Sequence, residues 1–131
     1  FCLVGSEMCI RDRPEGWEYE GWAVVNGTPV STGKFTSVTG ADDFSGFSGT
    51  TPGPAFPGED LLMNAPSGLT FPTDLSGGTV VISVEPSPDN STDPFLLKPL
   101  VGSVPSGALD HTSYDMDNNA SASNPTGTVS R

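Results

Sequence analysis

The sequence predicts an all-β fold, an antiparallel β-sandwich that is immunoglobulin-like in general architecture and has long Gly/Pro-rich loops. Three observations favour this class. The 131 residues suffice for one ordinary domain. The 16 glycines and 13 prolines disfavour long helices. The apolar segments are short, are separated by turn residues, and show no helical period over ten residues. A helical bundle is therefore excluded.

A β-hairpin is predicted near the start of the chain. Apolar side chains occupy odd positions of 17–25 and share one face, whereas Glu18 and Glu20 point to the other face. We expect that second face to contact solvent, which explains the two carboxylates without any chemistry. The Asn-Gly pair at 26–27 favours a type I′ turn, so the run 28–36 returns antiparallel to the first strand.

The return strand carries two residues that limit its place in the sheet. Pro29 has no N–H to donate, which predicts a strand start or an edge strand, and Gly33 predicts a bulge or a close backbone approach. The next segment, about 40–60, is too rich in glycine and proline for regular structure and is predicted as a long surface loop. We expect its phenylalanines to pack the loop onto the sandwich rather than form an adhesive patch. They are Phe44, Phe47 and Phe56.

Two further strands are predicted. Residues 79–85 are apolar on both faces in their first half, which indicates a central strand with the core beneath the face of Ile82. Residues 95–101 form the next strand, and Pro99 places that strand at an edge of the sheet.

The chain is interpreted as three segments. Residues 2–13 look like translated sequencing-adapter read-through, so 1–13 is taken as non-native; the alternative is a natural N-terminal strand with a disulfide between the two cysteines. Residues 14–110 form the β-sandwich domain, and 111–131 form a polar C-terminal segment or an incomplete last part of that domain. Since the native part begins in mid-protein, we expect any export signal or membrane anchor of the parent to lie upstream.

The charge balance excludes two classes of partner. The chain has 5 basic and 16 acidic residues, a net charge of -11, and no basic run. Nucleic acids and anionic membrane surfaces are bound through clustered lysine and arginine side chains. We therefore predict no nucleic-acid partner and no direct insertion of this chain into a membrane.

Two segments resemble a known family. The run 19–25, Tyr-Glu-Gly-Trp-Ala-Val-Val, followed by 27–35, is similar to the signature hairpin of the anti-sigma-K factor C-terminal domain. The strand 81–86 ends in Val-Glu-Pro and resembles that family's second signature. The matching positions are Tyr19, Gly21, Trp22, Gly27, Pro29, Val30, Ser31, Gly33, Phe35, Glu85 and Pro86. The likeness covers roughly 17–102 and departs in its longer 40–60 loop and in the Ser-Pro-Asp that follows Glu-Pro.

This resemblance implies a sensory or regulatory domain on the extracytoplasmic side of a membrane-anchored bacterial regulator. In such regulators a separate cytoplasmic segment inhibits a sigma factor, and the outer domain senses a signal or controls proteolytic release. The inhibitory segment is not among these residues, so we expect contact with a sigma factor only through that absent segment. The partner of the outer domain would be another envelope protein or a protease that acts on the parent.

A second hypothesis comes from a different functional class. The chain is then an exported or lipoprotein-type β-sandwich that binds a ligand or partner through its loops, with the aromatic 40–60 loop as the candidate surface and no sigma-factor connection.

Catalysis is not predicted. His111 is the single histidine and follows Asp110, but adjacent residues of an extended chain point to opposite faces, and no nucleophile elbow is present. A zinc site is excluded because one histidine and no cysteine are left outside 1–13. We predict no enzyme activity, no catalytic residue and no cofactor.

Calcium is the one metal considered. Asp115, Asp117 and Asn119 stand at alternate positions, as in the first half of an EF-hand loop. The pattern then fails, because Ala120 replaces the turn glycine and Thr126 replaces the bidentate glutamate. The acidic run 89–93 and this segment are both interpreted as solvated turns, so no metal site is predicted.

Overall fold

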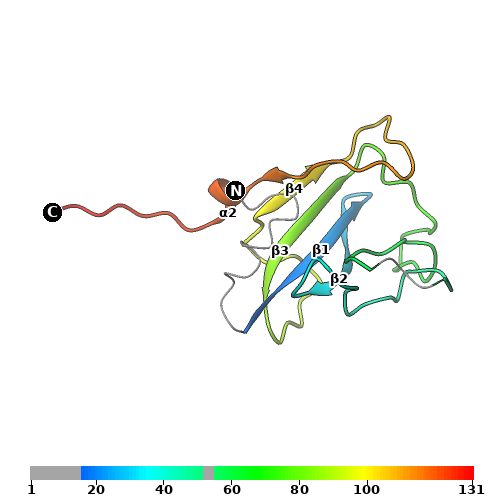
Figure 1. Cartoon of the computed structure of the whole chain (residues 1–131), viewed down its shortest axis with the longest axis horizontal. Helices are drawn as coiled ribbons and strands as arrows, with labels where there is room; N and C mark the ends of the chain where they lie inside the picture. Colours follow the sequence, from blue (N-terminus) through cyan, green and yellow to red (C-terminus); the bar gives the residue numbers. More distant parts are fainter. Residues whose placement is uncertain (1–15, 52–54) are drawn as a thin grey trace.

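The computed structural model describes residues 16–51 and 55–131. Its elements are β1 (Trp17–Val25), β2 (Thr28–Phe35), β3 (Thr79–Pro86), β4 (Leu100–Ser103), β5 (Asp117–Asn118) and the short helix α2 (Ala120–Ser123). The strands form one five-stranded sheet in the order β2-β1-β3-β4-β5, and all neighbours are antiparallel (Figure 1). The predicted all-β class is confirmed.

The sandwich and its immunoglobulin-like arrangement are not confirmed, because all strands of the described residues lie in a single sheet. Part of the second layer is replaced by the long connection from β2 to β3. That connection supplies Leu61, which is buried in a cluster with Ala23, Val25 and Val30 of the first hairpin. Half-buried apolar side chains of the same connection pack against this cluster: Phe47, Leu69, Phe71 and Leu75.

The first hairpin forms as predicted. Asn26 and Gly27 both have positive φ, 50° and 80°, as a type I′ turn requires. Pro29 lies in β2, which is an edge strand of the sheet. Its missing N–H therefore removes no bond from a central ladder.

Gly33 lies both at a β-bulge and at a close approach of the backbone to another segment, the two roles predicted for it. Gly21 pairs with Gly33 but Trp22 pairs with Ser31, so Thr32 is the extra residue of a β-bulge. Gly33 has φ 108°, and a Cβ at this position would lie 2.5 Å from the side chain of Asp42. Both the bulge and the close approach are confirmed.

The central place of β3 is confirmed, and Ile82 lies on the predicted core face, opposite Gly21 and on the same face as Ala23 of the core cluster. β3 lies between β1 and β4. Its buried side chains are Val81, Ser83 and Glu85, whereas Ile82 and its neighbours on the opposite face are half-buried. Ile82 is only half-buried because the layer of loop residues on its face is centred on the first hairpin, at Ala23, Val25 and Val30. Val81, Ser83 and Glu85 are buried on the opposite face, which they share with Trp22 and Glu20.

The strand predicted at 95–101 begins only at Leu100. Prolines at 94 and 99 have no N–H, and Leu96 before the second proline is exposed. One ladder-like bond precedes β4, from the N–H of Val84 to the carbonyl of Leu97, 2.8 Å. The predicted edge position is also wrong, because β4 pairs with both β3 and the two-residue β5.

The two ends of the chain differ. The segment 1–13 lies outside the described residues. Within 111–131, β5 pairs with β4, and the Ser123 side chain accepts a hydrogen bond from the N–H of Lys98, 3.1 Å. Residues beyond α2 extend away from the sheet (Figure 1). No helix in the described part of the chain is long and apolar enough to cross a membrane.

Candidate functional site

Three acidic side chains that are distant in sequence meet in the fold. We call Glu20, Glu85 and Asp89 the carboxylate cluster. One carboxylate oxygen of each residue lies within 4.8 Å of those of the other two. Glu20 is 4% exposed and Glu85 is 0% exposed. Among residues 16–51 and 55–131, no other group of three acidic, histidine or cysteine side chains comes this close together.

Strand pairing builds the carboxylate cluster. In the β1–β3 register Glu20 lies opposite Ser83 and Glu18 lies opposite Glu85, so Glu20 and Glu85 are diagonal neighbours on one face of the sheet. β3 ends at Pro86, and the proline-rich turn that follows brings Asp89 back over the same face.

The prediction that Glu20 contacts solvent is therefore wrong. The alternation of faces along β1 is confirmed, since Glu20 and its neighbours Glu18 and Trp22 point away from the core cluster of Ala23. That second face is not open at Glu20, however. The turn carrying Asp89 covers it together with Lys34 from β2, which lies opposite Glu20.

Hydrogen bonds hold one oxygen of each glutamate. Ser31 donates to Oε1 of Glu20, 2.5 Å. Trp22 donates through Nε1 to Oγ of Ser83, 2.8 Å, and Ser83 donates in turn to Oε1 of Glu85. The backbone N–H of Phe95 donates to that same oxygen, 2.7 Å. These bonds fix the orientation of both carboxylates.

The remaining oxygens of the carboxylate cluster accept no hydrogen bond. They are Oε2 of Glu20, Oε2 of Glu85 and Oδ2 of Asp89, and all three are buried. Of these, Oδ2 of Asp89 has an ion-pair contact with Lys34. A buried acceptor that has lost its water without gaining a donor is costly, and the cost rises when the group is charged. Carboxylate oxygens in such a position are also the ligands that hard divalent cations prefer.

Lys34 supplies the positive charge beside the carboxylate cluster. Its Nζ lies 3.4 Å from Oδ2 of Asp89 and 3.9 Å from Oε1 of Glu18. Burial alone lowers the pKa of Lys34, but the attraction of Glu20, Asp89 and Glu18 outweighs burial and raises that pKa above 10.5. Lys34 is therefore an ammonium ion at neutral pH. One ammonium group thus stands against four carboxylates, namely the three of the carboxylate cluster and that of Glu18.

The pKa of Glu20 is raised above its ordinary value of 4.5. Burial is the largest cause, and the charges of Glu85 and Asp89 act in the same direction, against the Ser31 hydrogen bond and Lys34. The folded chain thus binds this proton more tightly than the unfolded chain does. The contribution of Glu20 to stability is greatest below pH 4.5 and is lost as the pH rises through the raised value.

The loss of stability on ionisation of Glu20 leads to a prediction for Glu20→Gln. Glutamine keeps an oxygen for the Ser31 hydrogen bond but does not ionise. In chelator-containing buffer we expect the variant to melt at a higher temperature than the parent chain at about pH 7, with the difference shrinking as the pH falls towards about 4. Thermal unfolding followed by circular dichroism at several pH values checks this. A variant that is less stable than the parent at neutral pH would contradict the prediction.

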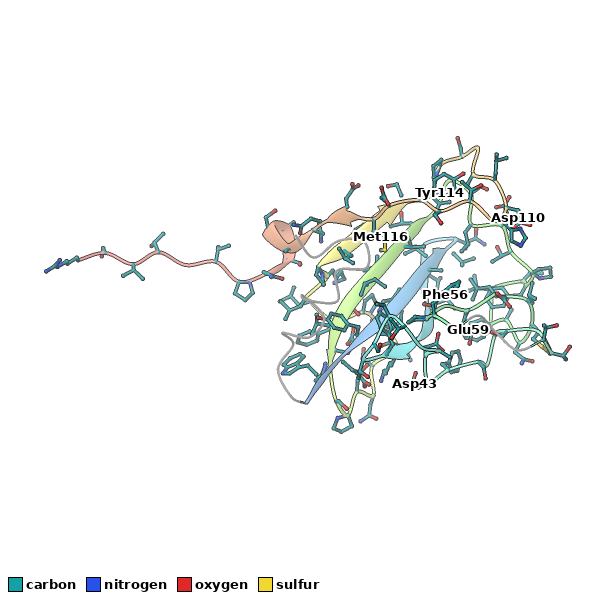
Figure 2. All side chains as sticks on the ribbon, in the orientation of Figure 1. Asp43, Phe56, Glu59, Asp110, Tyr114 and Met116 are labelled. Carbon is teal, nitrogen blue, oxygen red and sulfur yellow. The ribbon has the colours of Figure 1, made fainter. Side chains whose placement is uncertain are left out.

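A hollow of about 230 Å³ lies beside the carboxylate cluster. Its lining residues are Glu20, Ser31, Gly33, Lys34, Asp43 and Phe44. Asp43 lies beside β2 (Figure 2), where its side chain accepts the N–H of Lys34 at 2.7 Å. The hollow connects Glu20 and Lys34 with the surface next to the edge strand.

The three residues considered as weak calcium candidates lie in and beside β5. Asp115 is exposed, and Asp117 is exposed within β5, where it pairs with Val101. The side-chain amide of Asn119 donates to the carbonyl of Lys98 at 3.0 Å. The segment is therefore partly a strand rather than a continuous loop.

His111 and Asp110 do touch, contrary to the expectation from an extended chain. Nδ1 of His111 lies 3.0 Å from Oδ2 of Asp110, because His111 has φ 56° and the backbone turns there. Both side chains are more than nine-tenths exposed, at 91% and 92%. A catalytic triad requires a buried carboxylate to orient the histidine, and this pair does not provide one.

The residues of the family resemblance lie in β1, β2, β3 and the first turn. Seven of them are buried, namely Tyr19, Gly21, Trp22, Val30, Gly33, Phe35 and Glu85. The rings of Tyr19 and Phe35 stack at 5.7 Å. Comparison with protein-family models, with curated proteins and with solved structures found no match. The likeness to the anti-sigma-K factor domain therefore stays a prediction.

Proposed function

We propose that this chain is a non-catalytic regulatory β-domain of the extracytoplasmic type, comparable with the outer domain of anti-sigma-K factors. One observation carries the proposal. The two segments that resemble the family's signatures pair directly with each other, from Trp17 opposite Pro86 to Val24 opposite Thr79. The two segments, about 60 residues apart in sequence, thus form one continuous part of the sheet, as a shared scaffold requires.

The acidic groups fit a structural or ligand-holding role better than a reaction centre. In glycoside hydrolysis two carboxylates flank the scissile bond, so both must be accessible to the sugar substrate. Glu20 and Glu85 are buried and lie within the 4.8 Å carboxylate cluster. The adjoining hollow of about 230 Å³ is smaller than ordinary ligand pockets, which start at about 300 Å³.

A second candidate function is an exported binding module without a sigma-factor connection. The observation in its favour is the set of exposed apolar side chains on the long connection. Phe56 is 58% exposed, and Leu62 and Met63 are also exposed. Phe47 packs inward against the core cluster and contacts Phe44 and Phe71 edge to face. The predicted packing of the phenylalanines is thus confirmed for Phe47 and wrong for Phe56.

The proposal predicts that this chain does not bind a sigma factor. Its described residues offer strands and a four-residue helix, and an amphipathic helix able to grip a partner's helices is not among them. A pull-down of the chain against the sigma factors encoded beside the parent gene, at about 0.15 M salt to screen loose charge attraction, tests this. Saturable micromolar binding would place the inhibitory activity on this chain and overturn the proposal.

A chimera tests the regulatory role directly. The chain replaces the outer domain of a membrane-anchored regulator of the resembled family, and a sigma-dependent reporter is measured. Truncation of the outer domain is expected to abolish regulation of the reporter, and this chain is expected to restore it. Trp22→Ala removes a buried motif residue and should abolish the restored regulation. A chimera that behaves like the truncated regulator would favour the exported binding module instead.

A further inference from the structure

We propose that the carboxylate cluster binds a divalent cation of the size of calcium, and that Lys34 neutralises the same oxygens when the cation is absent. The ligands would be carboxylate oxygens of Glu20, Glu85 and Asp89. This inference concerns a site that the sequence predictions did not contain. It holds or fails independently of the regulatory role proposed above.

The first argument is the unused acceptors. Glu20 and Glu85 are more than nine-tenths buried, each has one oxygen fixed by hydrogen bonds, and each leaves Oε2 buried without a donor. Asp89 contributes a third buried oxygen, Oδ2, which is in ion-pair contact with Nζ of Lys34 at 3.4 Å. Three oriented and desolvated carboxylates within 4.8 Å form a ligand set whose positions are fixed before the ion arrives.

The second argument is size. Calcium binds oxygen at about 2.3–2.6 Å, so two of its ligands can be up to about 4.6–5.2 Å apart. Magnesium binds at about 2.0–2.1 Å and spans at most about 4.2 Å. The 4.8 Å bound on the oxygen separations lies within the span of calcium. Because it is an upper bound, the preference for calcium over magnesium rests on geometry, since magnesium demands a near-ideal octahedron. Calcium also accepts the irregular geometry that three side chains from two strands and a turn provide.

The third argument is charge and access. Lys34 contacts Asp89 through both its carboxylate and its backbone carbonyl, each at 3.4 Å, and adds one positive charge to the three carboxylates. A divalent ion neutralises them more fully and competes with the ammonium for the same oxygens. The hollow that is lined by Glu20 and Lys34 provides a path for the ion and space for the displaced side chain.

Isothermal titration calorimetry on the full chain, first treated with a chelator and then dialysed into about 0.15 M salt, tests the site. We expect saturable calcium binding, one ion per chain, with Kd of about 1 mM or tighter, and magnesium binding at least about tenfold weaker. Calcium should also raise the melting temperature in a saturable manner. Equal affinity for both ions would contradict the assignment to calcium, and a lack of saturable binding of either ion would overturn the site.

Matched variants locate the ion. Glu20→Gln should lose calcium binding at least about tenfold while staying folded, as its melting curve in chelator shows. Glu18→Gln removes the same charge from the same face of β1, but Glu18 is not in the carboxylate cluster, so near-parental binding is expected. Asp117→Asn tests the exposed segment in the same way. Equal losses in Glu20→Gln and in either control would show diffuse attraction to an acidic surface and overturn the proposal.

Substitution of Lys34 changes calcium affinity only if the carboxylate cluster binds the ion, so it distinguishes a metal site from a purely structural cluster. Lys34→Met removes the competing ammonium, so the variant should be less stable than the parent chain in chelator yet bind calcium about tenfold or more tightly. Weaker calcium binding by Lys34→Met would contradict the proposed competition. Unchanged affinity would show that Lys34 does not occupy the site.

Discussion

Replacing Leu61 by alanine is expected to lower the free energy of unfolding by about 2–5 kcal/mol, the range for truncating a buried leucine. Leu61 is 1% exposed and is the one residue of the long connection in the core cluster, where it joins Ala23, Val25 and Val30. Its truncation removes apolar contacts from both the sheet and the connection. Since no second sheet backs the hairpin in the described residues, little else can fill the space.

The neighbour Leu62 is the matched control. It has the same side chain but is 46% exposed, so Leu62→Ala should change the free energy of unfolding by no more than about 0.5 kcal/mol. Urea unfolding followed by tryptophan fluorescence measures both variants. Similar losses for the two leucines would mean that the connection does not form the cover of the sheet described above.

Trp22→Ala is expected to lower the free energy of unfolding by about 3–5 kcal/mol. Trp22 is 2% exposed, and its Nε1 donates to Ser83, which in turn holds Glu85. The variant therefore loses a large apolar contact and also frees Ser83, whose hydroxyl links β1 to the carboxylate cluster.

Trp22→Phe separates these two contributions. Phenylalanine keeps most of the apolar contact but cannot donate, so we expect a smaller loss, about 1–3 kcal/mol, from the missing bond to Ser83. The comparison is made by chemical unfolding in chelator, so that any bound ion does not contribute. A Trp22→Phe variant as stable as the parent would show that the hydrogen bond adds nothing.

Local sequence signals predicted the first hairpin well. The Asn-Gly turn, the bulge at Gly33 and the edge position of Pro29 each depend on the backbone preferences of one or two residues, and all three are confirmed. The strand β3 was also predictable, because a run of β-branched residues favours a central strand whatever covers it.

The carboxylate cluster could not be predicted in the same way. Alternation along β1 places Glu18 and Glu20 on one face, but only the β1–β3 register and the turn after Pro86 determine that Glu85 and Asp89 meet Glu20. The same limit explains why Ile82 is only half-buried although it lies on the predicted core face of β3. Alternation assigns Ile82 to a face, but the cover of that face comes from Leu61, and only long-range packing places Leu61 over the first hairpin rather than over β3.

The two margins of the sheet affect how the chain behaves at high concentration. An open sheet can recruit strands from other copies through unpaired N–H and C=O groups. On one margin, Pro29 lacks an N–H, Thr32 interrupts the ladder, and Asp43 occupies both the N–H and the carbonyl of Lys34. On the other, β5 is only two residues long. Both margins are thus poor templates for strand addition. The acidic chain should therefore resist fibril formation, although both edges of its sheet are open.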